Sequence, residues 1–321
     1  MDFINQIIAG DSLHLISELP DNCINLVICS PPYFNQRLYT GLPQEIGQEQ
    51  ETYDYISTLL TLFKQCTRVL KDDGSIVFNL GDKYINGSLA LIPWRFAAMV
   101  CVETDAKLIN QVTWVKTNPT PRPCEKRKMV CSTEPFFHFV KSSNYKYHQP
   151  EIVKRAKQSG SKIGQSYFKT IQESGLTYEQ KAVAIMELKD AIKQVNDGVI
   201  SSFRMKIKGK HALPYGGQAG GRMYQIKNKG FTIIKMSGGE MQRDVFECPV
   251  ETIRGIGHPA IYPKEIVERF ILLTTEVGDL VLDPFMGSGT TAVACKGLDR
   301  NYTGFDLCQD FVDKAKERVN G

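Results

Sequence analysis

The sequence predicts an α/β protein in which a parallel sheet is interrupted by an inserted module. Strand and helix signals alternate over residues 1–148, this rhythm breaks over residues 149–235, and it resumes over residues 236–321. Alternation of strands and helices is typical of a parallel sheet. We therefore expect the first and last segments to form one domain and the middle segment to be a separate insertion.

The first segment opens with strand and helix signals in turn. Ile24–Cys29 is a continuous apolar run, as in a strand that is buried on both faces. Thr52–Leu70 carries apolar residues at helical spacing, and the polar run Lys71–Gly74 predicts a stop before a strand over Ser75–Leu80. Further expected elements are strands over Ile4–Ala9, Leu108–Lys116 and Pro135–Val140, and helices over Ser12–Leu19 and Leu91–Val102.

The middle and last segments differ in character. In the middle segment Tyr178–Val195 has a helical pattern, whereas Gly209–Gly230, with two glycine pairs and several cations, predicts a flexible loop. The last segment returns to the α/β pattern. Its expected elements are helices over Pro263–Thr275, Thr290–Leu298 and Gln309–Val319, and strands over Leu280–Leu282 and Tyr302–Phe305.

Length and composition narrow the class of protein. A chain of 321 residues with 42% hydrophobic content can bury a full core. No apolar run approaches the roughly 18 to 20 residues of a membrane span, and Met1–Asn5 lacks the basic start of a signal peptide, so the cytoplasm is the expected location. The nine cysteines are spread singly, without a Cys-x-x-Cys pair, so we expect neither a disulfide framework nor a metal site.

The charge is unevenly distributed. The whole chain carries a net +4, but residues 151–235 hold 16 Lys and Arg against 6 Asp and Glu, a local net charge of +10. This asymmetry favours a nucleic-acid-binding face on the insertion, although a solvated basic helix would also produce it. The candidates for phosphate or base contacts are Arg204, Lys206, Lys208, Arg222, Lys227 and Lys229.

A glycine-containing turn, Asp283–Thr291, joins a predicted strand to a predicted helix. Glycines 287 and 289 let a ligand approach the backbone closely, and Thr290 or Thr291 can cap the helix. A Walker loop requires a lysine that is absent here, and the nicotinamide fingerprint Gly-x-Gly-x-x-Gly is also absent. Asp306 ends the next predicted strand, where doubly wound folds place an acid on ribose hydroxyls. A purely structural turn remains the alternative.

A second motif follows the buried strand at the carboxyl edge of the sheet: Ser30, Pro31, Pro32 and Tyr33. An ordinary strand exit would also use prolines, but the chemistry of an amino group explains the set better. The lone pair of a base amino group is delocalised into the ring, and two acceptors aimed at its N–H groups favour the pyramidal, nucleophilic form. The Ser30 hydroxyl and the Pro31 carbonyl can be those acceptors, and Tyr33 can stack on a base taken out of the duplex. We expect direct in-line transfer with the proton lost afterwards, because serine is too weak a base to act first.

Asp283–Thr291 resembles the cofactor motif of amino-group DNA methyltransferases. With Ser30–Tyr33 placed before the insertion and the cofactor motif after it, the chain resembles the β group of these enzymes from bacterial and phage modification systems. The resemblance implies a Rossmann-like methyltransferase sheet with circularly permuted motif order, S-adenosyl-L-methionine as cofactor, and double-stranded DNA with a flipped target base as substrate. It further implies a target-recognition role for residues 149–235 and a paired restriction endonuclease.

The resemblance also assigns individual residues. Gly10–Ser12, which includes Asp11 and Ser12, resembles the element that contacts the cofactor adenine; Trp114–Asn118 resembles a later strand motif; and His258 lies in the segment leading into the cofactor half. In this family serine at position 30 usually accompanies transfer to cytosine N4, and aspartate accompanies adenine N6, which stays the alternative. The remaining expected cofactor contacts are Asp283, Pro284, Phe285, Gly287, Ser288, Gly289, Thr290 and Asp306.

Other classes fit the sequence less well. RNA and protein amide methyltransferases usually carry Asn-Pro-Pro-Tyr after the cofactor motif, the opposite order. Cys124 follows a proline, as the nucleophile of ring-carbon cytosine methyltransferases does, but Ser30 already fills the catalytic position after the strand. A DNA-binding module without catalysis would bind DNA but not S-adenosylmethionine.

Overall fold

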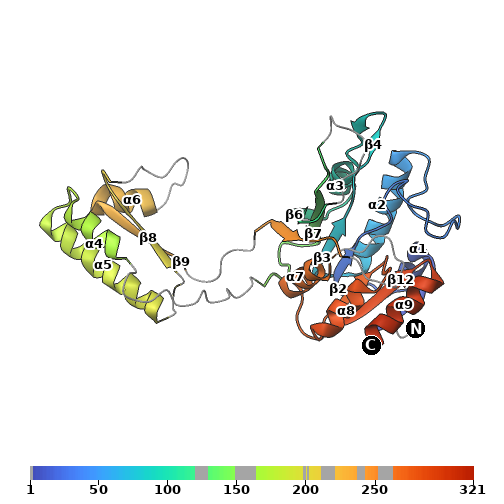
Figure 1. The fold of residues 1–321 in the computed structure, drawn as a ribbon. Helices are drawn as coiled ribbons and strands as arrows, with labels where there is room; N and C mark the ends of the chain where they lie inside the picture. Colours follow the sequence, from blue (N-terminus) through green and yellow to red (C-terminus); the bar gives the residue numbers. More distant parts are fainter. Residues whose placement is uncertain are drawn as a thin grey trace. The chain divides into compact units, whose positions relative to one another are not determined.

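The chain forms two compact units in the computed structural model (Figure 1). The sheet unit comprises residues 1–148 and 243–321, and the inserted unit comprises residues 149–242. The structure describes residues 3–119, 129–148, 164–197, 200, 202–210, 221–236, 243–251 and 263–321.

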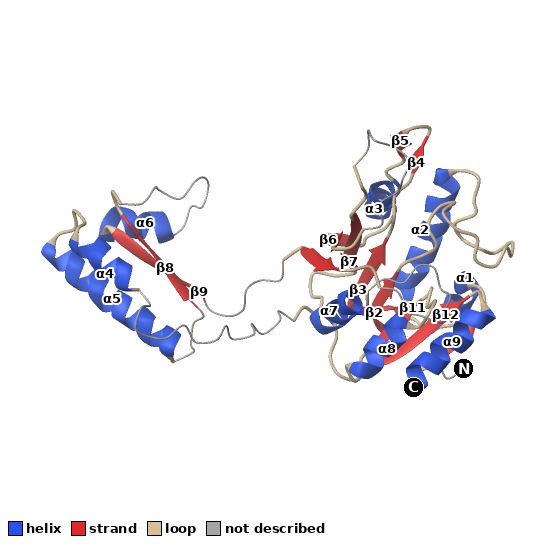
Figure 2. Ribbon diagram, viewed as in Figure 1, coloured by secondary structure: helices blue, strands red, loops and turns tan. Residues whose placement is uncertain are grey.

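An eight-stranded sheet in the order β1-β12-β11-β2-β3-β7-β6-β10 forms the centre of the sheet unit (Figure 2). Neighbouring strands are parallel except at β7, which runs antiparallel to both β3 and β6. The predicted α/β class is therefore confirmed. The strands are β1 (Gln6–Ala9), β2 (Ile24–Cys29), β3 (Leu70–Asn79), β6 (Lys107–Lys116), β7 (Thr133–Val140), β10 (Val245–Cys248), β11 (Leu280–Asp283) and β12 (Asn301–Asp306).

Helices cover both faces of this sheet. Successive residues of β2 point to opposite sides: Val27 packs in the cluster that contains α1, α2 and α3, and Ile28 packs in the cluster that contains α7 and α8. This explains why every residue of β2 except Asn25 is apolar. No helix in the described parts of the chain is long and apolar enough to cross a membrane. The helices are α1 (Ser12–Ser17), α2 (Thr52–Val69), α3 (Ile92–Glu103), α7 (Lys264–Thr274), α8 (Thr290–Gly297) and α9 (Gln309–Asn320).

The helix α2 ends at Val69, just before the predicted stop at Lys71–Gly74, but the predicted start of the strand at Ser75 is wrong, because β3 already begins at Leu70 and includes these residues. The pairing of β3 with β2 shifts register between Ile24 and Leu26, so this polar stretch belongs to an irregular strand and not to a turn. Gly74 is needed there, since a Cβ atom would lie 2.8 Å from the backbone oxygen of Asn25. Local polarity predicted a stop, whereas the pairs that Leu70 and Ser75 form with β2 on either side keep the stretch within the strand.

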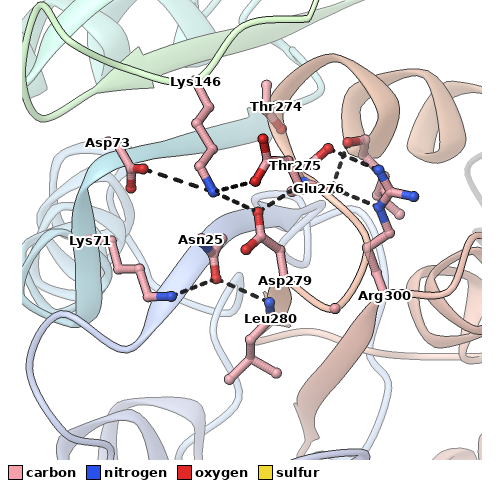
Figure 3. A network of polar contacts seen from close by, with 12 residues as sticks. Asn25, Lys71, Asp73, Lys146, Thr274, Thr275, Glu276, Asp279, Leu280 and Arg300 are labelled. Carbon is pink, nitrogen blue, oxygen red and sulfur yellow. Dashed lines mark hydrogen bonds and ion pairs between the residues drawn. The ribbon is translucent and has the colours of Figure 1, made fainter.

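A polar network ties the two chain segments together at the start of the central strands (Figure 3). The Lys146 Nζ lies 3.0 Å from Asp279 Oδ2 and 3.8 Å from Asp73 Oδ2. Asn25 Oδ1 accepts from the backbone N–H of Leu280 at 3.1 Å. Asn25 and Asp279 lie at the amino-terminal ends of β2 and β11, so the opposite, carboxyl edge of the sheet is left for the loops that follow these strands.

The buried His138 on β7 makes stability depend on pH. Its Nε2 lies 2.9 Å from Ser75 Oγ, and burial lowers the pKa of the imidazole to about 4. The pKa of a histidine in an unfolded chain is near 6.5. Between this pH and the lower pKa of the folded state, the unfolded chain binds a proton at His138 and the folded chain does not. Stability from this group is present above pH 6.5 and is lost as the pH falls towards 4.

We therefore expect His138 to account for a loss of about 2 kcal/mol in unfolding free energy between pH 7 and pH 5. Urea denaturation of wild type and His138→Gln at both pH values measures this, and the variant should show a smaller pH dependence. The matched control is His14→Gln, because the His14 side chain is 70% exposed. An unchanged pH dependence in His138→Gln would contradict the assignment.

The inserted unit has a small core of its own, which includes Ile171, Leu188, Met205 and Phe231. Strands β8 and β9 pair antiparallel, and α6 packs beside them. The flexible loop predicted over Gly209–Gly230 is wrong for its last part, which is helical because Ile226 is buried; residues 211–220 lie outside the described residues. The elements are α4 (Gln165–Gln172), α5 (Tyr178–Asn196), β8 (Ser202–Ile207), α6 (Gly221–Lys229) and β9 (Phe231–Met236).

Candidate functional site

The Ser30–Tyr33 segment leaves the carboxyl end of β2, and its backbone is held from the side by α2. The Tyr55 hydroxyl donates to the carbonyl oxygen of Pro32 at 2.8 Å. Within the described residues no hydrogen bond reaches the neighbouring Pro31 carbonyl. The structure thus places one proline carbonyl in a structural bond and leaves the other, the predicted acceptor, without a partner in that part of the chain.

The side chains of this segment join a compact polar network. The Tyr33 Oη lies 2.7 Å from Asn79 Oδ1 and 3.0 Å from Glu134 Oε2. The Ser30 Oγ lies 3.1 Å from Asn79 Oδ1 and 3.4 Å from Tyr33 Oη. Burial and the charge of Glu134 raise the pKa of Tyr33 well above its usual value, so this hydroxyl stays protonated.

The Tyr33 ring is fixed by packing as well as by these bonds. A Cβ atom at position 81 would lie 2.3 Å from Tyr33 Cε2, so the ring rests directly on the backbone of Gly81. Asn79 is oriented in turn, because its Nδ2 donates to the Pro135 carbonyl at 3.0 Å. Both hydroxyl groups of the Ser30–Tyr33 segment therefore contact an amide whose oxygen is directed towards them.

The turn after β11 is organised around the buried Asp283. Its carboxylate accepts from Thr291 Oγ1 at 2.5 Å and from the backbone N–H of Phe285 at 3.0 Å. The predicted capping by Thr290 or Thr291 is wrong: the N-cap of α8 is Gly289, at φ 79°, and no side chain caps the helix. The Asp283 carboxylate therefore stabilises the turn through internal hydrogen bonds. The sequence alone did not distinguish this structural role from direct contact with a ligand.

Two other residues of this turn contact α9. Arg318 donates to the Ser288 carbonyl at 3.1 Å and to Thr290 Oγ1 at 3.0 Å. Both Ser288 and Thr290 are buried. These contacts tie the turn to the last helix, so part of the motif serves to position its backbone.

Asp306 and the start of the chain complete this region. The Asp306 carboxylate accepts from the backbone N–H groups of Gly287 at 2.8 Å and Cys308 at 2.9 Å, and burial raises the pKa of this group. Ser12 Oγ donates to the Pro284 carbonyl at 2.5 Å. Asp11 accepts from the N–H of Leu13 as the N-cap of α1. The ends of β1, β11 and β12 thus bring together residues from both ends of the sequence.

Sequence reasoning missed the loop between Tyr33 and α2. The Tyr39 ring packs edge-on against Phe311 with ring centroids 6.5 Å apart. Burial, together with the charges of Glu45 and Asp306, raises the pKa of Tyr39. The buried Glu45 carboxylate anchors the loop by accepting from the N–H groups of Tyr39 and Thr40, each at 2.7 Å. No motif marks this loop, because its acceptor and donors become partners only through the loop's own fold.

The candidate DNA-contacting cations lie on two elements. Along β8, Arg204 and Lys206 alternate with the buried Met205 and Ile207, so they share the opposite face of the strand, and Lys208 follows in the same alternation. Arg222, Lys227 and Lys229 lie on α6. Lys229 Nζ is 3.5 Å from Glu187 Oε1 and so has an acidic partner. His258 and Cys124 lie outside the described residues.

The two motifs meet because β11 pairs directly with β2. From this pair the sheet extends through β12 and β1 on one side and through β3 on the other, so the turn after β11 and the segment after β2 lie at the point where the strand order reverses. In open α/β sheets ligands bind in the crevice at this point. The fold and the residues at this edge of the sheet are those of a Rossmann-like methyltransferase.

The comparisons with known proteins identify the family. The DNA methylase family model of N6 and N4 methyltransferases matches residues 24–317, and the chain belongs to this family. The type II methyltransferase M.Cfr9I of Citrobacter freundii is 26% identical, with 97% of this chain and 86% of the relative covered. M.PvuII of Proteus hauseri is also 26% identical, with 94% and 80% covered.

Solved structures show the same fold. The PvuII DNA methyltransferase (cytosine-N4-specific) superposes with a TM-score of 0.61 at 19% identity, covering 97% of this chain and 85% of that one. A putative DNA modification methylase from Thermus thermophilus, in complex with S-adenosyl-L-methionine, gives a TM-score of 0.55 at 19% identity, covering 98% and 93%. The predicted relationship to DNA amino-methyltransferases is confirmed.

Proposed function

We propose that this DNA methyltransferase transfers a methyl group from S-adenosyl-L-methionine to the N4 amino group of cytosine within a specific sequence of double-stranded DNA. Ser30 carries the choice of cytosine, because serine at this position usually accompanies N4 transfer in the enzymes that the chain resembles; its hydroxyl lies 3.1 Å from Asn79 Oδ1. The cytosine-N4-specific PvuII enzyme supports the same choice. The type II relatives suggest a role in restriction and modification, with an endonuclease acting on the same site.

S-adenosyl-L-methionine fits the residues at the ends of β1, β11 and β12. Each oxygen of Asp306 accepts one backbone N–H and keeps a lone pair for a ribose hydroxyl. Asp11 is partly exposed beside it, and Phe285 offers a partly buried apolar surface. The bound cofactor supplies a methyl group made electrophilic by its sulfonium. Asp306, Asp11 and Phe285 would hold and orient it.

The Ser30–Tyr33 segment would prepare the amino group of a base flipped out of the duplex. The Ser30 hydroxyl and the Pro31 carbonyl accept from the two N–H groups, which frees the nitrogen lone pair from the ring. Tyr33, held against Gly81, stacks on the base and limits its movement. None of these groups removes a proton first, so catalysis rests on position and electrostatics.

The inserted unit would recognise the target sequence, and we expect Arg204, Lys206 and Lys208 to contact DNA phosphates or bases. The triple alanine variant should reduce the salt dependence of binding, with the slope of log K against log salt smaller by about 3 and affinity lower by roughly 100-fold at moderate salt. Fluorescence anisotropy with duplex DNA at several salt concentrations measures both quantities.

The matched control removes the same charge from paired lysines of the inserted unit. Lys169, Lys210 and Lys235 have acidic partners at 3.8, 4.0 and 2.8 Å and are not among the candidate DNA contacts. Their triple alanine variant should lose much less affinity. Equal losses in the two variants would show that only the total charge of the unit matters, against a contact face on β8.

The decisive experiment is methylation of random-sequence DNA with labelled cofactor, followed by digestion to nucleosides and mapping of the modified positions. Labelled N4-methylcytosine supports the proposal. Labelled N6-methyladenine replaces cytosine with the alternative target of the same family. Cofactor binding without label in DNA contradicts the proposed activity.

A further inference from the structure

The polar network at Tyr33 continues to a charged pair, Glu134 and Lys116; Lys116 lies in the Trp114–Asn118 segment, whereas no motif of the sequence includes Glu134. One oxygen of Glu134 lies 3.0 Å from the Tyr33 hydroxyl, and the other forms an ion pair with Lys116. The two side chains are only 15% and 17% exposed. The Lys116 ammonium also lies 4.9 Å from the centroid of the buried Trp114 ring. Glu134 and Lys116 are therefore held in place on both sides.

The chemistry of these groups gives the network a direction. Lysine has donors only, and a carboxylate paired with it has acceptors only. The Asn79 amide nitrogen is used by the Pro135 carbonyl, so its oxygen, an acceptor, faces the two hydroxyl groups. The single Tyr33 proton is thus offered to Asn79 or Glu134, and the Ser30 proton is offered to Asn79 or Tyr33.

In this arrangement the Ser30 hydroxyl donates its proton to Asn79 or Tyr33. The Glu134 carboxylate and the Asn79 amide oxygen are acceptors, so neither donates a hydrogen bond to Ser30 or Tyr33. The lone pairs of the Ser30 oxygen stay available for an amino group of the substrate. If a hydrogen-bond donor replaced Glu134, it would donate to the Tyr33 oxygen. That oxygen would then be a weaker acceptor for the Ser30 hydroxyl. The availability of the Ser30 oxygen as an acceptor thus depends on Glu134 through the Tyr33 hydroxyl.

We infer that Glu134 and Lys116 are positioning residues which, through the Tyr33 hydroxyl, keep Ser30 as a hydrogen-bond acceptor towards the target amino group. This inference rests on the proposed amino-group transfer and adds two residues to its machinery. Lys116 ends β6 and Glu134 begins β7, and the antiparallel pairing of these strands places Glu134 opposite Trp114. Because β7 is antiparallel to its neighbours, its first residues lie at the carboxyl edge of the sheet, where Ser30 also lies.

The test is a double-mutant cycle of Glu134→Gln and Tyr33→Phe in the full chain, with kcat and KM measured on the mapped DNA site. Each single variant should lower kcat by about 30-fold and change KM for DNA and cofactor by less than about twofold. The double variant should be no slower than the slower single variant, because both changes interrupt the same path. A double variant whose losses multiply would overturn the inference, and so would an effect on KM alone.

Lys116→Met tests the same chain of contacts from its other end. It should lower kcat when introduced into the wild type, and it should not lower kcat further when introduced into Tyr33→Phe. The matched control is Lys141→Met, which removes a lysine ion-paired at 3.3 Å with Asp72 beyond the other end of β7 and should leave kcat unchanged. Urea denaturation confirms that each variant folds. A wild-type rate in folded Glu134→Gln contradicts this inference alone, whereas absence of DNA methylation by the wild-type chain contradicts the proposed function.

Discussion

Replacing Ser30 with alanine is expected to lower kcat for DNA methylation by roughly 100- to 1,000-fold, the range seen when one preorganised hydrogen-bonding group is removed from an active site. The hydroxyl is the side-chain acceptor that the Ser30–Tyr33 segment offers to an amino group. Its removal leaves the Pro31 carbonyl as the remaining acceptor of that segment. Single-turnover transfer of labelled methyl groups to the mapped site measures the chemical step without product release.

Binding should be largely unaffected in Ser30→Ala. The Asp306 and Asp283 contacts that shape the cofactor turn do not involve Ser30, so cofactor affinity should stay within about twofold of wild type. Ser17→Ala is the matched control, because this exposed serine donates to the His14 carbonyl at 2.6 Å, within its own helix. A wild-type transfer rate in Ser30→Ala would refute the acceptor role. A loss confined to cofactor binding would also refute it and would place Ser30 among the residues that bind the cofactor.

Gly289→Ala is expected to lower the free energy of unfolding by about 3 kcal/mol and to weaken cofactor binding at least about tenfold. The residue has φ +79°, which costs an L side chain about 1 kcal/mol. Its Cβ atom would also lie 2.9 Å from Ala315 Cβ and 3.1 Å from Ala315 Cα, so α8 and α9 must separate. Urea denaturation and calorimetric titration with S-adenosyl-L-methionine measure the two effects.

Gly278→Ala separates the two causes. Gly278 has φ +84° but no atom within 4 Å of an added Cβ, so its replacement should cost only the conformational strain, about 1 kcal/mol, and leave cofactor binding unchanged. The excess loss in Gly289→Ala then reports the contact with Ala315. Equal losses in the two variants would show that close packing of the turn against α9 contributes nothing.

Most strands and helices of the sheet unit could be predicted because their signals are local. Ile24–Cys29 is a strand with the predicted bounds, since both of its faces are buried and every residue but Asn25 is apolar. Prediction failed where tertiary contacts override local polarity. The polar Lys71–Gly74 lies within β3 because Leu70 and Ser75, on either side of it, pair with β2, and the cation-rich Gly221–Lys229 is helical because it buries Ile226.

By itself, the sequence determined the α/β class, the Ser30–Tyr33 and Asp283–Thr291 motifs, and their order around the insertion, because these depend on residue type and spacing along the chain. Only the tertiary structure decided that β11 pairs with β2 and that β7 is reversed. Strand order and direction depend on contacts between distant segments, which leave no local pattern. The partners of Tyr33, namely Asn79 and Glu134, come from two such strands, and this is why they could be found only in the fold.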